Sequence, residues 1–527
     1  MAPPPFSVID LFAGPGGLGE GFSAFRAKGR QKFEIAVSIE KEESAARTLR
    51  FRAFMRLARR QRVELDLRSF QPASKTGVRD WLEGQSKDVH RLWRESGTEA
   101  WQVALGETEG LEHEIESVLS KIPGERIVIG GPPCQAYSLV GRARNRGIDG
   151  YVPEEDQRHF LYEEYIKILK RVHPVAFVME NVKGILSARV RKAGVFASIE
   201  RDLRAAGYEL FPLAPRSQMP IDLGDEGLRD PRDFVVRSEE FGIPQARHRV
   251  IVVGIHTDRA QELRERYDAP VGRLLVDAFG APGEPVPVET VLQGLPPLHS
   301  TLSRRGRSDE DDWKSVVRAH ASMLEADAGV RETVEAAGGE HGEFLAELRR
   351  VVEILGPKPV GELPEPPGSP DARCLHDWLT SNWSGPVKNH EPRGHMKEDL
   401  GRYLFASAWA KATGVSPKQP DFPAALAPDH ANWSTGKFAD RFRVQVTGAP
   451  ATTVTSHISK DGHYFIHPDP GQCRSLTVRE AARIQTFPDD YIFLGNRTQQ
   501  YVQVGNAVPP LLARRIAGAL NRVLDRG

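Results

Sequence analysis

The sequence contains no run of apolar residues long enough to span a bilayer, which takes about 20 such residues in a helix. Residues 1–5 lack the charged segment followed by an apolar segment that marks a secretory signal peptide. Cysteine is scarce, and Cys134, Cys374 and Cys473 are spaced too widely for a disulfide framework or a zinc cluster. These absences predict a cytoplasmic protein with no membrane anchor and no metal site.

The chain also has no excess of charge of either sign, because 71 Lys and Arg residues balance 71 Asp and Glu residues. The net charge therefore does not indicate that the protein binds nucleic acid. The distribution of charge along the chain is more informative than the net charge. Basic residues cluster at 141–146 and 304–307, and each cluster is ordinarily a solvated loop. A chain of 527 residues is too long for one core and is expected to form two or three domains.

Short apolar runs alternate with helical patterns in the first half of the chain. The predicted strands are 7–12, 34–39, 126–131, 174–180 and 249–255, and the predicted helices are 42–60, 157–171 and 195–206. Such alternation is typical of an α/β fold with a doubly wound, mostly parallel sheet. The polar stretch 68–121 is interpreted as a helical insertion into this fold.

The second half of the chain is less regular. From about 260 to 445 the periodicity is weak, and 356–370 is a proline-rich linker or long loop. This segment predicts a second, irregular domain or a large insertion. Helical patterns return at 476–486 and 510–524.

Cys134 follows the apolar run 126–129, in the sequence Gly130-Gly131-Pro132-Pro133-Cys134-Gln135. This places the cysteine at the carboxyl edge of the predicted sheet, where α/β proteins bind ligands. The prolines stiffen the turn, and the glycines allow a ring or another backbone to approach closely. A lone cysteine is more commonly a buried structural residue. Its interpretation therefore depends on the other strand ends.

Gly14-Pro15-Gly16-Gly17-Leu18-Gly19 matches the pattern G-x-G-x-x-G between a predicted strand and a predicted helix, and Glu40 ends the next strand. The pattern indicates a site for an adenosine-containing cofactor, with the acid on a ribose hydroxyl. A glycine-rich turn without a ligand is the plain alternative. Taken alone, the pattern also allows a nicotinamide-dependent oxidoreductase.

Charged side chains stand at two further strand ends. Glu180 closes the strand 174–180, where an apolar wall can raise the pKa of a carboxyl group enough to hold or deliver a proton. Gln245, Arg247 and Arg249 alternate and therefore share one face of a strand. Two guanidinium groups on one face suit an anion or the acceptor edge of a base. Exposed strand ends and solvated faces are the ordinary alternatives.

Together these segments resemble the DNA (cytosine-5) methyltransferases of the prokaryotic restriction-modification type, which depend on S-adenosylmethionine. The resemblance covers about 1–67, 122–255 and 445–527, roughly half of the chain, and the motifs stand in the family's order. The motifs are Asp10 to Gly17, Pro132 to Gln135, Asp156-x-Arg158-x-x-Leu161, Glu180 to Val182, Gln245-x-Arg247-x-Arg249, Leu476 to Glu480 with Gln485-x-Phe487-Pro488, and Gly505 to Pro510.

The resemblance implies a Rossmann-like class I methyltransferase with an irregular target-recognition domain. The catalytic domain that binds S-adenosylmethionine would span residues 1–275 and contain the helical insertion 68–121. Residues 276–445 would form the target-recognition domain. Residues 446–527 would be a C-terminal segment that returns to the catalytic domain.

The resemblance also implies a catalytic set. The thiolate of Cys134 would add to carbon 6 of cytosine, which makes carbon 5 able to accept a methyl group. Glu180 would bind the exocyclic amine and ring nitrogen N3. Arg247 would contact the base carbonyl, with Arg249 behind it. Because the target atom is inaccessible in a stacked duplex, the base must flip out, and residues 138–152 would close over it.

For the cofactor, the resemblance implies that Phe12 faces the adenosine end and that Gly14, Gly16 and Gly17 admit the methionine end. Glu40 would hold the ribose hydroxyls, and Asp66 is the candidate acid for the adenine amine. The remaining residues of the implied pocket are Pro133, Leu161 and Asn506.

The expected protein is a monomeric enzyme that methylates a defined sequence of double-stranded DNA. It would be cytoplasmic and associated with the nucleoid through DNA, alongside a cognate restriction nuclease or defence proteins that act on the same sites. An RNA cytosine-5 methyltransferase is one alternative. A nicotinamide-dependent oxidoreductase would leave Cys134 without a role, and the intact Cys134 and Glu180 argue against a catalytically silent DNA-binding relative. Polar residues at 389–395 and 452–455 are candidate DNA contacts, although ordinary loop positions are commoner.

Overall fold

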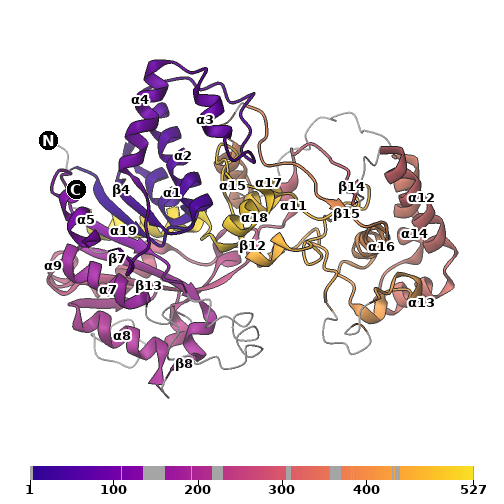
Figure 1. The fold of residues 1–527 in the computed structure, drawn as a ribbon. Coiled ribbons are helices and arrows are strands. Elements are labelled where there is room, and N and C mark those ends of the chain that lie inside the picture. Colours follow the sequence, from indigo (N-terminus) through magenta and orange to yellow (C-terminus); the bar gives the residue numbers. More distant parts are fainter. Residues whose placement is uncertain are drawn as a thin grey trace.

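A computed structural model describes residues 4–108, 110–133, 161–190, 193–215, 230–303, 310–355, 370–380, 383, 385–429, 433 and 440–525. These residues form two lobes, of which the larger holds both ends of the chain and the smaller lies to the right in Figure 1. Cys134 lies outside the described residues, as do the basic clusters 141–146 and 304–307.

The larger lobe is built on one sheet in the order β10-β13-β7-β6-β1-β4-β5, with β11 paired to β13. The five strands from β7 to β5 pair in parallel, whereas β10, β11 and β7 all pair antiparallel to β13. The strands are β1 (Phe6–Leu11), β4 (Phe33–Glu40), β5 (Ala100–Gln102), β6 (Arg126–Gly130), β7 (Ala176–Val182), β10 (Tyr208–Phe211), β11 (Val235–Arg237) and β13 (His248–His256).

Helices cover both faces of this sheet, which confirms the predicted mostly parallel α/β fold. Every residue of β1 is buried, and Val8 packs into the core on one face while Ile9 and Leu11 pack into the core on the other. A strand buried on both faces produces the continuous apolar run seen in the sequence. The first face is covered by α1 (Gly17–Ala24), α10 (Val271–Phe279) and α19 (Pro510–Leu524), and the second by α5 (Leu111–Leu119), α7 (Leu161–Val172) and α8 (Val195–Ala205).

The stretch 68–121 is not purely a helical insertion, because Ala100–Gln102 form the edge strand β5 beside β4. Three residues are too few to show a strand period in the sequence. The same stretch contains α3 (Gly77–Leu82) and α4 (Lys87–Glu95), which share a core with α2 (Glu43–Arg60). These three helices form the upper part of the larger lobe in Figure 1.

The described part of the smaller lobe combines α-helices with long irregular segments, whereas the weak periodicity of its sequence predicted an irregular domain. Trp313, Val317, Ala321 and Leu324 of one helix are buried and recur at helical spacing. The last helix of the lobe is buried on almost every side, which hides its period in the sequence. The helices are α12 (Glu310–Ala326), α13 (Ala328–Ala336), α14 (His341–Glu353) and α16 (Lys397–Thr413), and they share one core.

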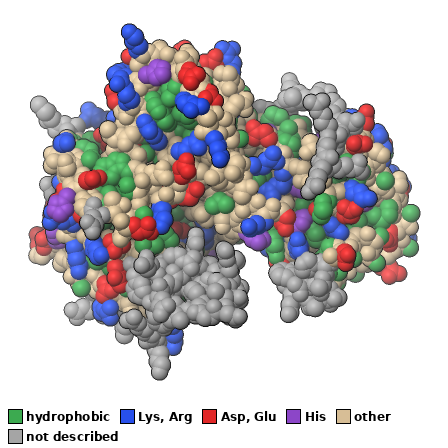
Figure 2. Space-filling model, in the orientation of Figure 1, with side chains coloured by type: hydrophobic (Ala, Val, Ile, Leu, Met, Phe, Trp, Pro, Cys, Tyr) green, Lys and Arg blue, Asp and Glu red, His purple; other side chains and the backbone are tan. Residues whose placement is uncertain are grey.

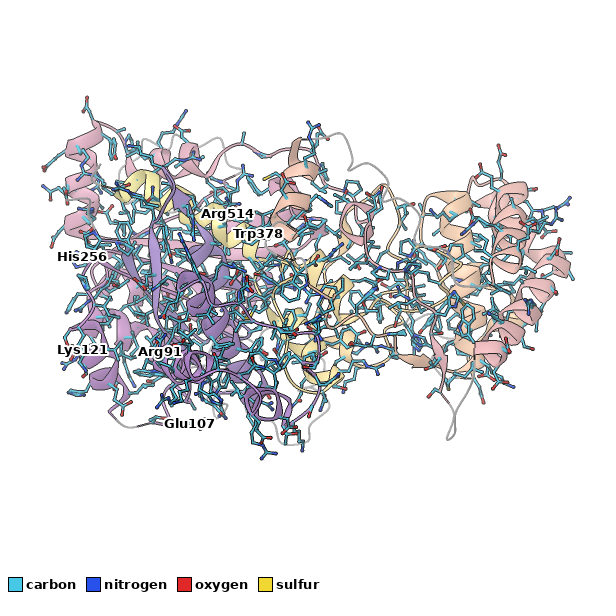
Figure 3. All side chains as sticks on the ribbon, turned by 90° about the horizontal axis from the view of Figure 1, so that it is seen from above. Arg91, Glu107, Lys121, His256, Trp378 and Arg514 are labelled. Atoms are coloured by element: carbon cyan, nitrogen blue, oxygen red, sulfur yellow. The ribbon has the colours of Figure 1, made fainter. Side chains whose placement is uncertain are left out.

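The chain crosses back to the larger lobe more than once. Helix α15 (Pro370–Thr380) packs beside α19, where the Trp378 indole donates to the Thr486 carbonyl at 2.7 Å. The Arg514 guanidinium lies 5.3 Å from the centre of the Trp378 ring. Figure 3 labels both residues, which lie close to each other. The C-terminal segment forms α17 (Val478–Ile484) and α18 (Arg497–Asn506) before α19. Among the helices described, none combines the length and apolar character needed to cross a membrane.

Candidate active site at the carboxyl edge of the sheet

The strand order brings the predicted motifs to neighbouring positions. Strand β6, which leads to Pro132 and Pro133, lies between β1 and β7. The glycine turn follows β1, and Glu180 lies near the carboxyl end of β7. Because β13 runs antiparallel, its first residues lie at the same edge, and Arg249 pairs with Val182. One edge therefore gathers the ends of four adjacent strands.

The glycine turn is shaped by backbone conformations that most residues avoid. Phe12, Gly14 and Gly16 have φ angles of 54°, 57° and 94°. The angle at Phe12 is uncommon for a bulky residue, and such strain is concentrated at functional sites. A Cβ atom on Gly17 would lie 2.1 Å from the Val508 carbonyl oxygen, whereas one on Gly14 would meet no atom within 4 Å. The turn is therefore packed against the C-terminal segment at Gly17 and open at Gly14.

Glu40 connects the end of β4 to this turn. Its carboxylate accepts the Gly14 N–H at 2.8 Å and the Glu42 N–H at 2.7 Å. Burial raises the pKa of Glu40 above its usual range, and the backbone N–H groups of Glu42 and Gly14 oppose that rise. Each carboxylate oxygen therefore has one fixed donor and can accept a further hydroxyl group.

Three further predicted cofactor residues belong to the same edge or face it from the C-terminal segment. Pro133 is half-buried after β6, and Leu161 is half-buried at the start of α7. Asn506 ends α18 and is exposed, although its neighbours Gly505 and Ala507 are buried. Its amide is therefore free to face a ligand.

Asp66 does not join this group. Its exposed carboxylate binds the Arg68 guanidinium at 2.7 Å, which lowers the pKa of Asp66 to about 2. Its carbonyl oxygen accepts the Trp81 indole N–H, so the residue belongs to the layer of α2 and α3. The third strand of the sheet is β5, and residues 63–67 form no strand. Asp66 thus does not stand at the end of a strand, whereas Glu40 does.

Glu180 and Arg249 form a half-buried ion pair. The Arg249 Nε atom lies 2.8 Å from Glu180 Oε1, and the side chains are only 13% and 12% exposed. Burial lowers the pKa of Arg249, and the charge of Glu180 opposes that effect. A charged pair at an otherwise apolar strand edge is suited to a polar ring that carries both donors and acceptors.

Arg247 is placed differently from its neighbour. Its guanidinium donates to the Val454 carbonyl at 2.8 Å and to the Gly505 carbonyl at 3.4 Å, and the residue is fully buried. Burial, together with the positive charge of Arg249, lowers the pKa of Arg247 well below its usual range. Arg247 therefore joins β13 to the C-terminal segment and does not face the open edge.

Gln245 reinforces this junction. Its amide oxygen accepts the Val454 N–H at 2.6 Å, and its amide nitrogen donates to Gln485 Oε1 at 3.0 Å. Gln485 in turn donates to the Val504 carbonyl at 2.7 Å. The motif at 245–249 is thus partly structural, because Gln245 and Arg247 are bound to the C-terminal segment.

Three residues that sequence reasoning gave no role also support the edge. The Asn181 amide donates to the Pro132 carbonyl at 3.2 Å, which holds the turn before Cys134. The Tyr491 hydroxyl donates to the Pro15 carbonyl in the glycine turn. Asp10 is completely buried, with no hydrogen-bond partner for either carboxyl oxygen among the described residues. Asn181 and Asp10 belong to motifs named in the sequence analysis, so the sequence could have indicated that they matter. Nothing in the sequence near Tyr491 predicts its hydrogen bond to Pro15.

The loop positions considered as DNA contacts are mostly internal. Asn389 makes two hydrogen bonds with the backbone of Phe493, and His390 bonds to Thr477 and to the Pro296 carbonyl. Thr453 donates to the Ala246 carbonyl. The ordinary interpretation of these residues is therefore the better one.

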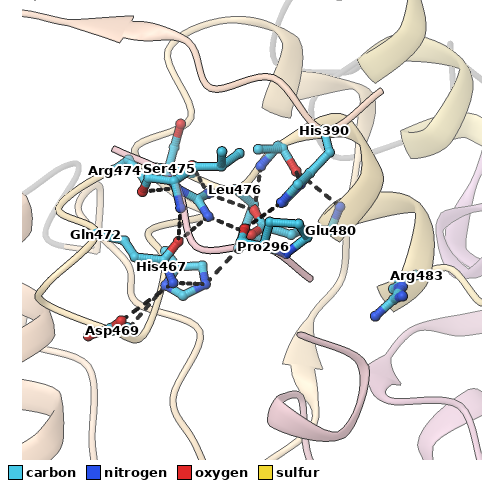
Figure 4. Close-up of polar contacts among 12 residues, drawn as sticks. Pro296, His390, His467, Asp469, Gln472, Arg474, Ser475, Leu476, Glu480 and Arg483 are labelled. Carbon is cyan, nitrogen blue, oxygen red and sulfur yellow. Dashed lines mark hydrogen bonds and ion pairs between the residues drawn. The ribbon is translucent and has the colours of Figure 1, made fainter. Parts of the chain in front are cut away.

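A buried polar cluster stabilises the junction between the lobes (Figure 4). Thr477 and Glu480 form a capping box at the start of α17, and Glu480 binds the Arg474 guanidinium at 2.6 Å. The His467 ring lies 3.6 Å from Glu480, and burial lowers the pKa of His467 to about 4. This cluster fixes the segment that leads from the smaller lobe to α17.

Comparison with known proteins agrees with this geometry. The family model of the C-5 cytosine-specific DNA methylases matches residues 105–271 and 386–522, together more than half of the chain. The type II methyltransferase M.Bpa9945I of Bacillus paralicheniformis is 32% identical, with 98% of this chain and 99% of that protein covered. The DNA (cytosine-5-)-methyltransferase M.ApeKI of Aeropyrum pernix is 27% identical over 76% of this chain and 81% of that protein.

A solved structure described as a DNA modification methyltransferase encoded within a prophage (E. coli) has the same fold. It aligns with a TM-score of 0.50 and 18% identity, over 99% of this chain and 100% of that chain. The sequence relatives extend that likeness from fold to family. The chain therefore belongs to the C-5 cytosine-specific DNA methylases, enzymes that methylate carbon 5 of cytosine in DNA.

Proposed function

We propose that this enzyme takes the methyl group from S-adenosylmethionine and transfers it to cytosine within a specific sequence of double-stranded DNA. The observation that carries the proposal is the meeting of three features at adjacent strand ends. These are the glycine turn at 14–17, the Pro132-Pro133 turn that leads to Cys134, and the Glu180–Arg249 ion pair. The edge thus combines a cofactor site with groups that suit a pyrimidine ring.

The residues around the glycine turn fit S-adenosylmethionine. The space in front of Gly14 is open, the Glu40 carboxylate borders the turn, and Asn506 is exposed. Gly14, Gly16 and Gly17 would hold the methionine end, Glu40 the ribose hydroxyls and Phe12 the adenosine end, with the pocket completed by Pro133, Leu161 and Asn506. When bound, S-adenosylmethionine supplies an electrophilic methyl group.

Cys134 is the proposed nucleophile. Its thiolate adds to carbon 6 of the cytosine, which makes the ring enamine-like and carbon 5 nucleophilic. A free thiol has a pKa of about 8.5 and is mostly protonated at neutral pH, so it needs a positive environment. Arg249 would supply such charge. After methyl transfer, carbon 5 loses its proton and the carbon–sulfur bond breaks, which restores both the ring and the thiol.

Glu180 and Arg249 are the proposed groups for the base. Glu180 would bind the exocyclic amine and N3, and would supply a proton to N3, where negative charge develops as the thiolate adds. Arg249 would contact the base carbonyl, because it lies beside Glu180 at the open edge. Arg247, which is bound to two carbonyl groups, would act as a positioning residue. These roles reverse the order of the two arginines expected from the sequence.

The base would have to leave the duplex, at a cost of a few kcal/mol, to reach this edge. Residues 1–275 would form the catalytic domain, 276–445 the target-recognition domain, and 446–527 a segment that completes the catalytic domain. The separate core of the smaller lobe supports a second domain, although this core also includes Ile466 and Cys473, and α15 packs against the larger lobe.

The biological setting is proposed from the relatives, two of which are named type II methyltransferases. The enzyme would act as a monomer in a restriction-modification system. Methylation would protect cell DNA from a nuclease of the same specificity and contribute to phage defence.

A covalent-trapping experiment tests the proposal. Duplexes that carry 5-fluorocytosine should form an adduct of protein and DNA with the wild type and S-adenosylmethionine, because fluorine cannot leave as the C5 proton does. Cys134→Ala should abolish both the adduct and methyl incorporation, whereas Cys374→Ser, at an exposed position on α15, should retain both. Undiminished methylation by Cys134→Ala would refute the mechanism, and methylation of RNA in preference to duplex DNA would refute the substrate.

A further inference from the structure

The layer of α2, α3 and α4 contains a cavity that the methylation site does not use. Its volume is about 450 Å³, within the range of small-molecule sites. It is lined from α2 by Arg47, from the start of α3 by Lys75 and Arg79, and from α4 by His90 and Trp93. None of these residues lies at the strand ends of the sheet, so the cavity is separate from the candidate active site.

The floor of the cavity is apolar and firmly packed. Val78 and Leu82 line it, and only 8% of each side chain is exposed. The Trp93 ring is fixed by the Arg50 guanidinium, 4.3 Å from its centre, and by the edge-to-face ring of Phe54. A rigid indole beside aliphatic side chains offers a surface on which a flat ring can stack.

The rim carries positive charge with little compensation. Three cations, Arg47, Lys75 and Arg79, face one carboxylate, Glu83. In the described part of the chain neither Arg47 nor Lys75 has an ion-pair partner, and Arg47 donates only to the Lys75 carbonyl at 3.0 Å. Arg79 pairs with its exposed neighbour Asp80 at 3.4 Å, a contact of little energetic weight. Figure 2 shows hydrophobic side chains on this lobe with basic side chains around them.

We propose that this cavity binds a nucleotide, with the phosphate on Arg47, Lys75 and Arg79 and the base against Val78, Leu82 and Trp93. Cations suit phosphate oxygens, and an apolar floor beside an indole suits any base because every base has a flat π face. The nucleotide comes either from solution or from the DNA that flanks the target sequence. Binding of flanking DNA rests on the proposed function, whereas binding of a free nucleotide does not.

Binding of mononucleotides to the full-length protein tests the first source. ATP and dTMP are titrated calorimetrically into the wild type, the double variant Lys75→Glu/Arg79→Glu, and Arg94→Glu as a control. Arg94 is exposed on α4 outside the cavity, so its reversal adds negative charge close to the cavity without touching the site, at half the charge change of the double variant. The double variant should bind about tenfold more weakly, while the control should bind as the wild type does.

Duplex binding tests the second source. A short duplex that holds only the target and a long duplex with flanking DNA are compared across salt concentrations. If flanking DNA supplies the nucleotide, the double variant should lose affinity only for the long duplex, with a smaller salt dependence. The proposal is overturned if the double variant alters neither mononucleotide nor long-duplex binding, or if Arg94→Glu has the same effect. The double variant should methylate the short duplex as the wild type does. This result separates failure of the nucleotide proposal from failure of the proposed methyltransferase mechanism, which the Cys134→Ala variant tests.

Discussion

The cofactor half and the base half of the sheet edge are constructed in different ways. The centre of the cofactor half lies within residues 12–40, because Gly14 donates directly to Glu40 across the neighbouring strands β1 and β4, and the C-terminal segment packs against it at Gly17. The base half depends on distant segments for its charged side chains, since Arg247 is held by carbonyl groups 207 and 258 residues away in the sequence. Local backbone conformation shapes most of the glycine turn, whereas the base half requires a buried charge to find partners elsewhere in the fold.

The largest expected effect contrasts the two arginines of the base half. Arg249→Ala should lower kcat/KM by about 10²–10³-fold, the usual cost of losing one donor that stabilises developing charge. Arg247→Ala should instead lower the free energy of unfolding by about 1–3 kcal/mol, because the Val454 carbonyl loses its donor inside the protein. Steady-state methylation and denaturant unfolding measure the two effects.

Arg237→Ala is the matched control for both arginine variants, because Arg237 lies on the adjacent strand β11 and its side chain is 40% exposed. The control should leave activity and stability close to those of the wild type. If Arg247→Ala keeps its stability and loses activity, while Arg249→Ala stays active, the proposed division of roles is wrong.

A smaller effect separates packing from ligand space within the cofactor half. Gly17→Ala should lower the free energy of unfolding by about 1–3 kcal/mol, because the new methyl group would meet the Val508 carbonyl. Gly14→Ala finds open space, so its main expected effect is weaker binding of S-adenosylmethionine, beyond the modest backbone strain at φ 57°. Thermal unfolding and cofactor titration distinguish the variants, and equal cofactor affinity for Gly14→Ala and the wild type would argue against a ligand at Gly14.

A further expected effect concerns pH and the cofactor half. Burial raises the pKa of Asp10 to about 8, so the folded protein keeps a proton that the unfolded chain releases above about pH 4. The folded state then binds more protons between about pH 4 and about pH 8, and this group makes the free energy of unfolding fall as pH rises. The slope from one group is at most about 1.4 kcal/mol per pH unit.

Asp10→Asn removes that titration and should flatten the fall in stability with rising pH, as measured by denaturant unfolding across this range. Asp258→Asn is the control, because the Asp258 side chain is 92% exposed. An unchanged pH slope in Asp10→Asn would mean that Asp10 is ionised in the folded protein.

Much of the fold could be predicted from local patterns. The five predicted strands and the long helix at 42–60 occur close to their expected positions, because buried parallel strands are continuous apolar runs. Strand β5 was missed since its three residues carry no period, and α16 was missed since nearly all of its residues are buried. In both elements the sequence lacks the regular alternation of apolar and polar residues from which strands and helices are predicted.

The candidate site divides in the same way. Phe12, Gly14 and Glu40 could be placed from the strand–turn–helix pattern, and the structure brings them together. Asp66 does not join them, because the strand that pairs with β4 is β5, which lies much further along the chain. The roles of Arg247 and Arg249 could not be distinguished, since both fall on the same face of one strand.

The sequence by itself determined the family and the residue types at each strand end, because catalytic chemistry demands particular side chains at particular spacings. Only the tertiary structure decided which of those side chains face the open edge. A buried guanidinium must satisfy its donors, and the carbonyl groups that do so for Arg247 come from a segment that reaches β13 only after the chain has built the second lobe.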